Sequence, residues 1–189
     1  MKTVASLLLC FSLAVLPAYA GDSASRSHDL GEIARVATIM IDGDTCQRIV
    51  TPRALAHMLH PDPRDVWQAG DNYDVDESAF ISTKKMLMRL AMMEPYPVDV
   101  NLWMPLPTTP ASIQVVIRNK YNLSQFWDGE LQQKMPPVMS EVLKMGKSLT
   151  ITKEPGMISV LAPVHNSLGQ IVGLVEVVSS TAPPEHDER

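Results

Sequence analysis

Apolar residues recur every three or four positions through the first half of the chain, which is the spacing of amphipathic helices. The pattern predicts a helix over residues 30–41, with Asp29 as its N-cap. A second, short helix is expected to begin with Thr51 as N-cap and Pro52 in its first turn. The clearest pattern covers residues 78–93 and predicts a third helix.

Together these patterns indicate a helical segment over residues 29–93, in which Phe80 and Leu87 face an apolar core and Lys84 lies on the polar side. Five prolines then follow within residues 94–111. Proline lacks a backbone N–H, so this stretch cannot form a regular helix, and any strand in it should be short or at an edge. We interpret residues 94–111 as a Pro-rich connector.

The second half of the chain is typical of a sheet. Residues 113–117 are a β-branched run, and the runs 157–164 and 171–178 are joined by a short turn that contains glycine. Between the runs 113–117 and 157–164, residues 131–145 have apolar residues at helical spacing, and Gly146 follows as a C-cap. The succession of helices and then strands predicts an α+β protein.

The two ends of the chain differ from the body. Residues 1–20 combine a positive start, an apolar run and a small-residue ending, and this pattern is typical of a secretory signal peptide. Residues 21–28 and 181–189 are polar, and we expect both to be disordered. The sequence therefore predicts a domain that is exported to the periplasm or secreted.

Charge and motifs exclude several functions. The net charge is −5, which is unfavourable for binding nucleic acid. The sequence contains no G-x-S-x-G, H-E-x-x-H, P-loop or G-x-G-x-x-G motif, and no Cys-x-x-Cys-His for haem attachment. We therefore expect a protein that is not an enzyme and that carries no resident cofactor or metal.

The C-terminal third combines the strand 113–117, the segment EVLKMGK at 141–147 and the segment ISVLAPVHNSLGQIVGLVEVV at 158–178. With these segments in this order, it resembles a Cache or PAS-like extracellular sensor domain. The resemblance implies that residues 112–180 form a PAS-like antiparallel sheet on which the helical segment packs. It further implies a sensor-type domain that binds a small molecule. Members of this family usually lead into a transmembrane helix and a signalling module, and no such segment follows residue 178 in this sequence. We therefore expect a sensor domain without its own output module, which works through a signalling or transport partner at the membrane.

Candidate ligand-binding residues follow the first strand of this region. Arg118, Tyr121, Trp127 and Asp128, with Phe126 beside them, combine charged groups with aromatic rings. An arginine holds a carboxylate through two parallel hydrogen bonds, so these residues suit an acidic or zwitterionic ligand. The alternative is that the aromatic side chains cap the core and that Arg118 is solvated.

Two other classes of protein remain open at this point. Cys46, His57 and His60 would serve a metal- or haem-handling protein if the fold brought them together. His57 and His60 are three residues apart on a predicted helix, which can hold a metal or haem edge, but no third ligand follows at a recognised spacing, and this favours ordinary surface histidines. A structural interaction protein with a filled core and no pocket is the third possibility.

Overall fold

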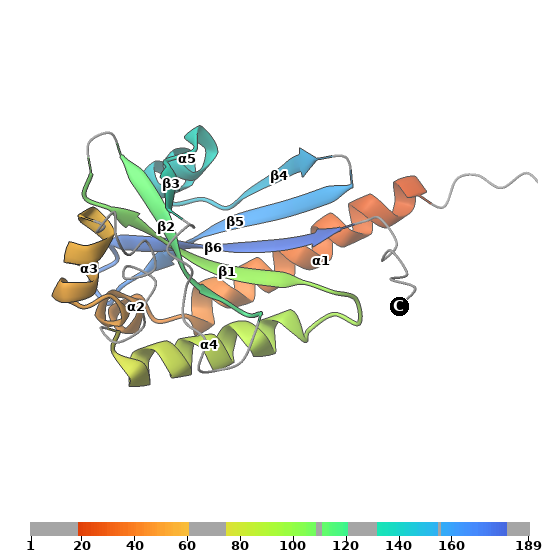
Figure 1. The fold of residues 1–189 in the computed structure, drawn as a ribbon. Helices are drawn as coiled ribbons and strands as arrows, with labels where there is room; N and C mark the ends of the chain where they lie inside the picture. Colours follow the sequence, from red (N-terminus) through yellow and green to blue (C-terminus); the bar gives the residue numbers. More distant parts are fainter. Residues whose placement is uncertain (1–18, 61–74, 109–110, 121–131, 155, 181–189) are drawn as a thin grey trace, which may run out of the picture.

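The β-branched runs form an antiparallel sheet (Figure 1). The computed structural model describes residues 19–60, 75–108, 111–120, 132–154 and 156–180 of the chain. Over these ranges the sheet has six strands in the order β3-β2-β1-β6-β5-β4. The strands are β1 (Asp99–Leu106), β2 (Ser112–Arg118), β3 (Gln132–Lys134), β4 (Leu149–Glu154), β5 (Met157–His165) and β6 (Ile171–Ser180).

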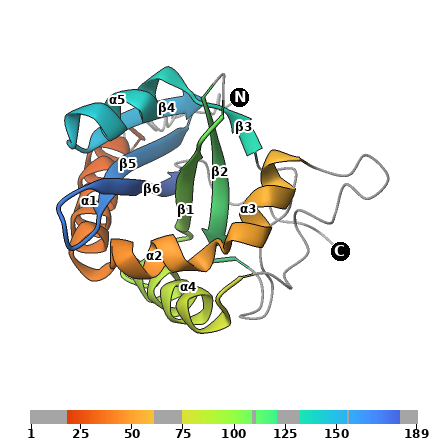
Figure 2. The ribbon, with the colours of Figure 1, turned by 90° about the vertical axis from the view of Figure 1, so that its left-hand side faces the viewer.

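Helices cover both faces of this sheet (Figures 1 and 2). Helices α1 and α4 lie on one face, where α1 contacts β5 and β6 and α4 contacts β1 and β2. Helix α5 lies on the opposite face, against β5 and β6. The helices are α1 (Tyr19–Met40), α2 (Gly43–Ile49), α3 (Pro52–Leu59), α4 (Glu77–Ala91) and α5 (Pro137–Met145). The α+β class, with helices packed on an antiparallel sheet, is confirmed.

Helix ends follow the capping chemistry of the sequence. The Thr51 hydroxyl accepts a hydrogen bond from the backbone N–H of Ala54, so the predicted cap of α3 is confirmed. Asp42 and Asp76 cap α2 and α4 in the same way. Gly146 ends α5 with φ of 66°, a left-handed conformation that glycine adopts without strain.

Each face of the sheet has its own apolar core. On the face of α1, α2 and α4, the core includes Ile33, Phe80 and Leu87, all fully buried. On the face of α5, a smaller core includes Trp103 and Leu174. We call these the helical face and the α5 face.

The N-terminal stretch expected to be disordered is helical. Residues 21–28 belong to α1, and Arg26 Nη1 donates a hydrogen bond of 2.6 Å to the carbonyl of Ser180 at the end of β6. Asp29 is consequently an interior helix residue and not an N-cap, and its carboxylate accepts a hydrogen bond from Tyr96. Packing against the sheet stabilises this helix despite the weak apolar pattern of its first turns.

The Pro-rich connector contains a strand. Residues 99–106 form β1, so the sheet begins before residue 112, the expected start of the sheet domain. Pro105 pairs opposite Ile113 of β2, beyond Trp103, the last residue of β1 that pairs with β6. The missing N–H of Pro105 therefore falls where β1 has a neighbour on one side only.

Two further expectations need correction. The helix expected over residues 131–145 begins only at Pro137, and residues 132–134 form β3. The prolines at 136 and 137 explain this start, because proline is tolerated in the first turn of a helix but not in its interior. Lys84 was expected on the polar side of α4, yet it is 1% exposed, and burial lowers its pKa.

Within the ranges described above, no helix is both long enough and apolar enough to cross a membrane.

Candidate functional site

A row of polar side chains crosses the α5 face of the sheet. Arg118 of β2 pairs opposite Asn101 of β1, and Asn101 pairs opposite Glu176 of β6. Directly paired residues of antiparallel strands point to the same face. The three side chains therefore share the face on which Trp103 and Leu174 pack under α5.

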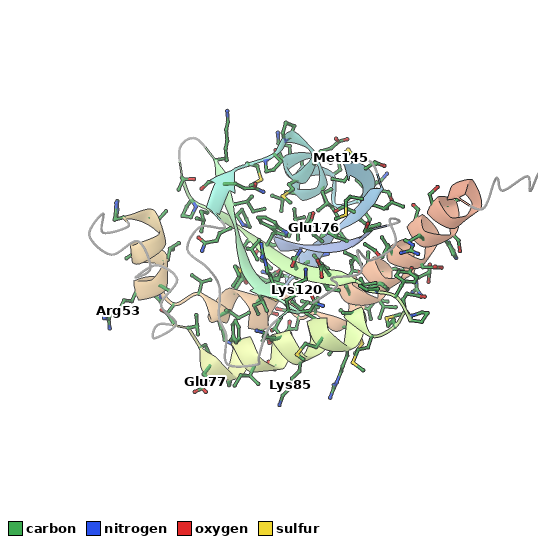
Figure 3. All side chains as sticks on the ribbon, turned by 45° about the vertical axis from the view of Figure 1, so that its right-hand side comes forward. Arg53, Glu77, Lys85, Lys120, Met145 and Glu176 are labelled. Atoms are coloured by element: carbon green, nitrogen blue, oxygen red, sulfur yellow. The ribbon has the colours of Figure 1, made fainter. Side chains whose placement is uncertain are left out.

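Glu176 is the most buried member of this row, with 2% of its surface exposed. Its Oε2 atom accepts hydrogen bonds from Trp103 Nε1 at 2.9 Å and from Asn101 Nδ2 at 3.5 Å. Its Oε1 atom accepts a hydrogen bond from the Ser159 hydroxyl at 2.9 Å. The carboxylate thus joins side chains of β1, β5 and β6 beneath α5, and Figure 3 shows it in the interior, whereas Glu77 and Lys85 project outward from α4.

Arg118 lies at the opposite end of the row, where β2 ends, and its side chain is half-buried. The Nε atom of Arg118 is buried and has no hydrogen-bond partner. Unpaired buried donors are uncommon in folded proteins, because each costs the free energy of its lost hydration. The guanidinium could therefore donate a further hydrogen bond to a partner that presents oxygen atoms.

A second pair of charges lies beside this row. Lys120 Nζ and Asp99 Oδ2 form an ion pair of 2.7 Å, with side-chain exposures of 53% and 36%. Asp99 is two residues from Asn101 along β1, so its side chain points to the same face. We call Asp99, Asn101, Arg118 and Lys120 the polar corner; Glu176 lies beneath it.

The polar corner can bind an anionic group. The Arg118 guanidinium offers several N–H donors in one plane, which matches a carboxylate or phosphate. Asn101 adds a side chain that can both donate and accept hydrogen bonds. Trp103, 7% exposed, is held by its bond to Glu176 and gives the site a rigid apolar neighbour.

Of the predicted ligand-binding residues, the structure places Arg118 in this corner. Tyr121, Trp127 and Asp128, together with Phe126, lie outside the described residues. Two hollows lined by described residues lie elsewhere, one of about 420 Å³ between α1 and the β4–β5 strands and one of about 120 Å³ between α1 and α4.

The residues of the alternative metal site have different surroundings. Cys46 is 1% exposed in α2, and burial raises the pKa of its thiol to about 12. His60 is exposed at the end of α3, and the side chain of His57 is not among those described. Across the described part of the chain, no three side chains of metal-binding type converge.

Sequence reasoning missed Glu176. The signal was present, because Glu176 is a single acidic residue within the apolar strand Ile171–Ser180. A charged residue at such a position is either exposed at an edge or buried with hydrogen-bond partners. Choosing between the two needed the strand order, which places β6 in the middle of the sheet.

Comparison with known proteins leaves the family open. No protein-family model matches the chain, and no curated protein matches it. Among solved structures, it is similar to the nlh2 GAF domain of A. aeolicus in an inactive state, with 11% sequence identity and a TM-score of 0.37. That match covers 69% of this chain and 80% of the GAF domain.

Proposed function

We propose that this domain binds a small acidic or zwitterionic molecule at the polar corner and works as a sensor-type binding module. The observation that carries the proposal is the buried and unpaired Nε of Arg118 on the same sheet face as Asn101 and Glu176. A ligand carboxylate at this position would accept the hydrogen bond that Arg118 Nε lacks.

The energetics favour a ligand over an unfilled corner. A buried donor without a partner costs about 1–3 kcal/mol, and a charged hydrogen bond contributes roughly 1.5–3 kcal/mol. Binding a carboxylate would remove the first cost and add the second contribution. The neighbouring Lys120 is exposed and already paired with Asp99, so its contribution should be smaller and sensitive to salt.

We further propose that the domain works outside the cytoplasm, after removal of residues 1–20, and passes its ligand state to a membrane partner. The sequence pattern of residues 1–20 supports export. Cleavage after Ala20 would take only the first two residues of α1, so the contact of Arg26 with Ser180 would be retained.

The test is a thermal-shift titration of the protein with acetate, succinate and glutamate. A ligand that binds the folded state raises Tm by mass action, and the rise grows with ligand concentration. The Arg118→Ala variant should lose this rise, with at least a tenfold weaker Kd, while its Tm without ligand stays close to that of the native chain.

Arg53→Ala is the matched control, because Arg53 is an exposed arginine on α3, away from the corner (Figure 3). It should bind as tightly as the native chain. Equal affinities of Arg118→Ala and the native chain for every anion that binds would refute the proposed site.

A further inference from the structure

We propose that the hollow between α1 and the β4–β5 hairpin is a second binding site, which takes an uncharged molecule with several hydroxyl groups, a sugar or polyol of monosaccharide size. The hollow has a volume of about 420 Å³, and small-molecule sites range over roughly 300–1,000 Å³. It lies apart from the polar corner and does not depend on the function proposed for that corner. Its walls are formed by Ser23, Ala24 and Ser27 of α1 and by Thr150, Thr152 and Ile158 of the hairpin.

The hollow arises because the inward side of α1 changes character along the helix. Leu30, Ala34 and Ala37 recur at helical spacing and are buried against the sheet. The same spacing, continued toward the N-terminus, reaches Ser27 and Ser23, and both line the hollow. Short hydroxyl side chains therefore stand where the pattern would place apolar ones, and they leave the space between helix and hairpin open.

The facing wall carries hydroxyl groups as well. Leu149 and Ile151 of β4 pack against the core of the α5 face. Successive side chains of a strand point to opposite faces, so Thr150 and Thr152 point to the side on which α1 lies. Ile158 of β5 pairs opposite Thr152 and is 7% exposed. The hollow thus combines hydroxyl groups on two walls with an apolar surface from Ile158.

This lining suits an uncharged ligand with hydroxyl groups of its own. A hydroxyl both donates and accepts hydrogen bonds, so Ser27, Thr150 and Thr152 can contact a ligand in addition to any bonds that they make within the protein. None of the described residues that line the hollow carries a charge. An ion would lose hydration there without meeting an opposite charge. A polyol would exchange its hydrogen bonds with water for similar bonds with the protein, and its C–H groups would contact Ile158.

The experiment is an NMR titration of the protein with glycerol, xylose, glucose and mannitol, up to about 100 mM of each. At least one of them should shift the amide resonances of Ser27 and Thr152 in a saturable manner, with a roughly millimolar Kd. Saturable shifts at these residues are distinct from the general stabilisation by sugars, which are excluded from protein surfaces. Glucuronate, in which a carboxylate replaces the terminal hydroxymethyl group of glucose, should bind more weakly than glucose at the same resonances.

Two pairs of variants locate the site. Ser27→Leu extends the apolar side of α1 into the hollow, so it should abolish the saturable shifts and raise Tm without ligand, because the added side chain fills a space. Ser25→Leu adds the same side chain at an exposed position of α1 outside the lining, and should bind as the native chain does.

The second pair removes single hydroxyl groups. Thr152→Val keeps the shape of the side chain and its preference for a strand, and should weaken binding by roughly two- to tenfold through the lost hydrogen bond. Ser148→Ala removes an exposed hydroxyl just before β4, outside the lining, and should change nothing.

Each possible result decides the proposal. It is wrong if none of the four compounds gives saturable shifts, or if the shifts persist unchanged in Thr152→Val and in Ser27→Leu. If Ser27→Leu does not fold, Thr152→Val decides by itself. Tighter binding of glucuronate than of glucose would overturn the uncharged class of ligand. Arg118→Ala should leave the sugar affinity unchanged, so this site and the polar corner stand or fall separately.

Discussion

The two faces of the sheet differ in the size of their apolar cores and in the polar side chains that they carry. On the helical face, α1, α2 and α4 enclose a continuous core that includes Ile33, Phe80 and Leu87. On the α5 face, the apolar core is smaller, and a row of polar side chains lies beside it. One sheet thus has a face that carries the larger core and a face on which we propose that a ligand binds.

The difference in burial between the two faces predicts where the fold tolerates substitutions. Side chains of the helical core are close to fully buried, so removing one leaves a cavity. Arg118 and Asn101 are only half-buried, and their polar groups reach solvent or a ligand. We therefore expect stability and the proposed ligand binding to depend on largely different residues, and the following experiments test that expectation.

The largest effect is expected for Phe80→Ala on the helical face. Phe80 is fully buried, and removing its ring should lower the free energy of unfolding by about 3–5 kcal/mol. Arg118→Ala on the α5 face should lower it far less, because the side chain is half-buried and the substitution removes a buried donor that has no partner. Urea denaturation of the two variants measures both values, and similar losses would contradict the division of roles between the faces.

A smaller effect is expected where α2 meets the β5–β6 hairpin. A Cβ atom at Gly43 would lie 2.4 Å from the backbone carbonyl oxygen of His165. Gly43→Ala should therefore force the helix and hairpin apart and lower the free energy of unfolding by about 1–3 kcal/mol.

Gly31→Ala is the matched control for that substitution. Gly31 lies within α1, and a Cβ atom there would meet nothing within 4 Å. Alanine is the better helix former by about 0.8–1 kcal/mol, so this variant should be more stable than the native chain. Equal changes of Tm in the two variants would show that the contact with His165 is unimportant.

The smallest effect concerns the pH dependence of the helical face. Tyr96 donates a hydrogen bond to Asp29, and Arg26 lies 4.1 Å from the centre of its ring. Burial, with the charge of Asp29, raises the pKa of Tyr96 from 10.0 to about 12. Between these values the folded protein keeps a proton that the unfolded chain loses, so stability should fall as pH rises through this window.

Tyr96→Phe should reduce this alkaline loss of stability, as measured by urea denaturation at pH values below and within the window. Cys46, whose pKa burial also raises to about 12, contributes with the same sign, but it is present in both proteins and cancels in the comparison. An unchanged slope in Tyr96→Phe would mean that Tyr96 titrates at its ordinary pKa.

Much of the fold was predictable because local chemistry decided it. Thr51 and Pro52 marked the start of α3, Gly146 marked the end of α5, and the β-branched runs marked β2, β5 and β6. Each of these signals acts within a few residues of sequence, so it can be read without knowing what packs nearby.

The rest depended on contacts between distant segments. Residues 21–28 are helical because the sheet offers α1 a surface, and β1 tolerates Pro105 because β6 does not reach that far along it. Lys84 is buried although helical periodicity placed it on the polar side.

The candidate site was predicted only at Arg118. Its position after a strand and before aromatic residues was visible in the sequence. Strand pairing brings Asn101 and Glu176 to the same part of the sheet as Arg118, and these two residues are 75 positions apart in the sequence.

The position of β6 in the sheet has a consequence for when the protein can fold. β6 is the last described strand along the chain, yet it lies between β1 and β5 and joins the two halves of the sheet. A nascent polypeptide that ends before Ile171 has the two half-sheets but nothing to connect them, and long-range pairing of this kind slows folding. The six described strands can therefore form one sheet only after residues 171–180 have been synthesised.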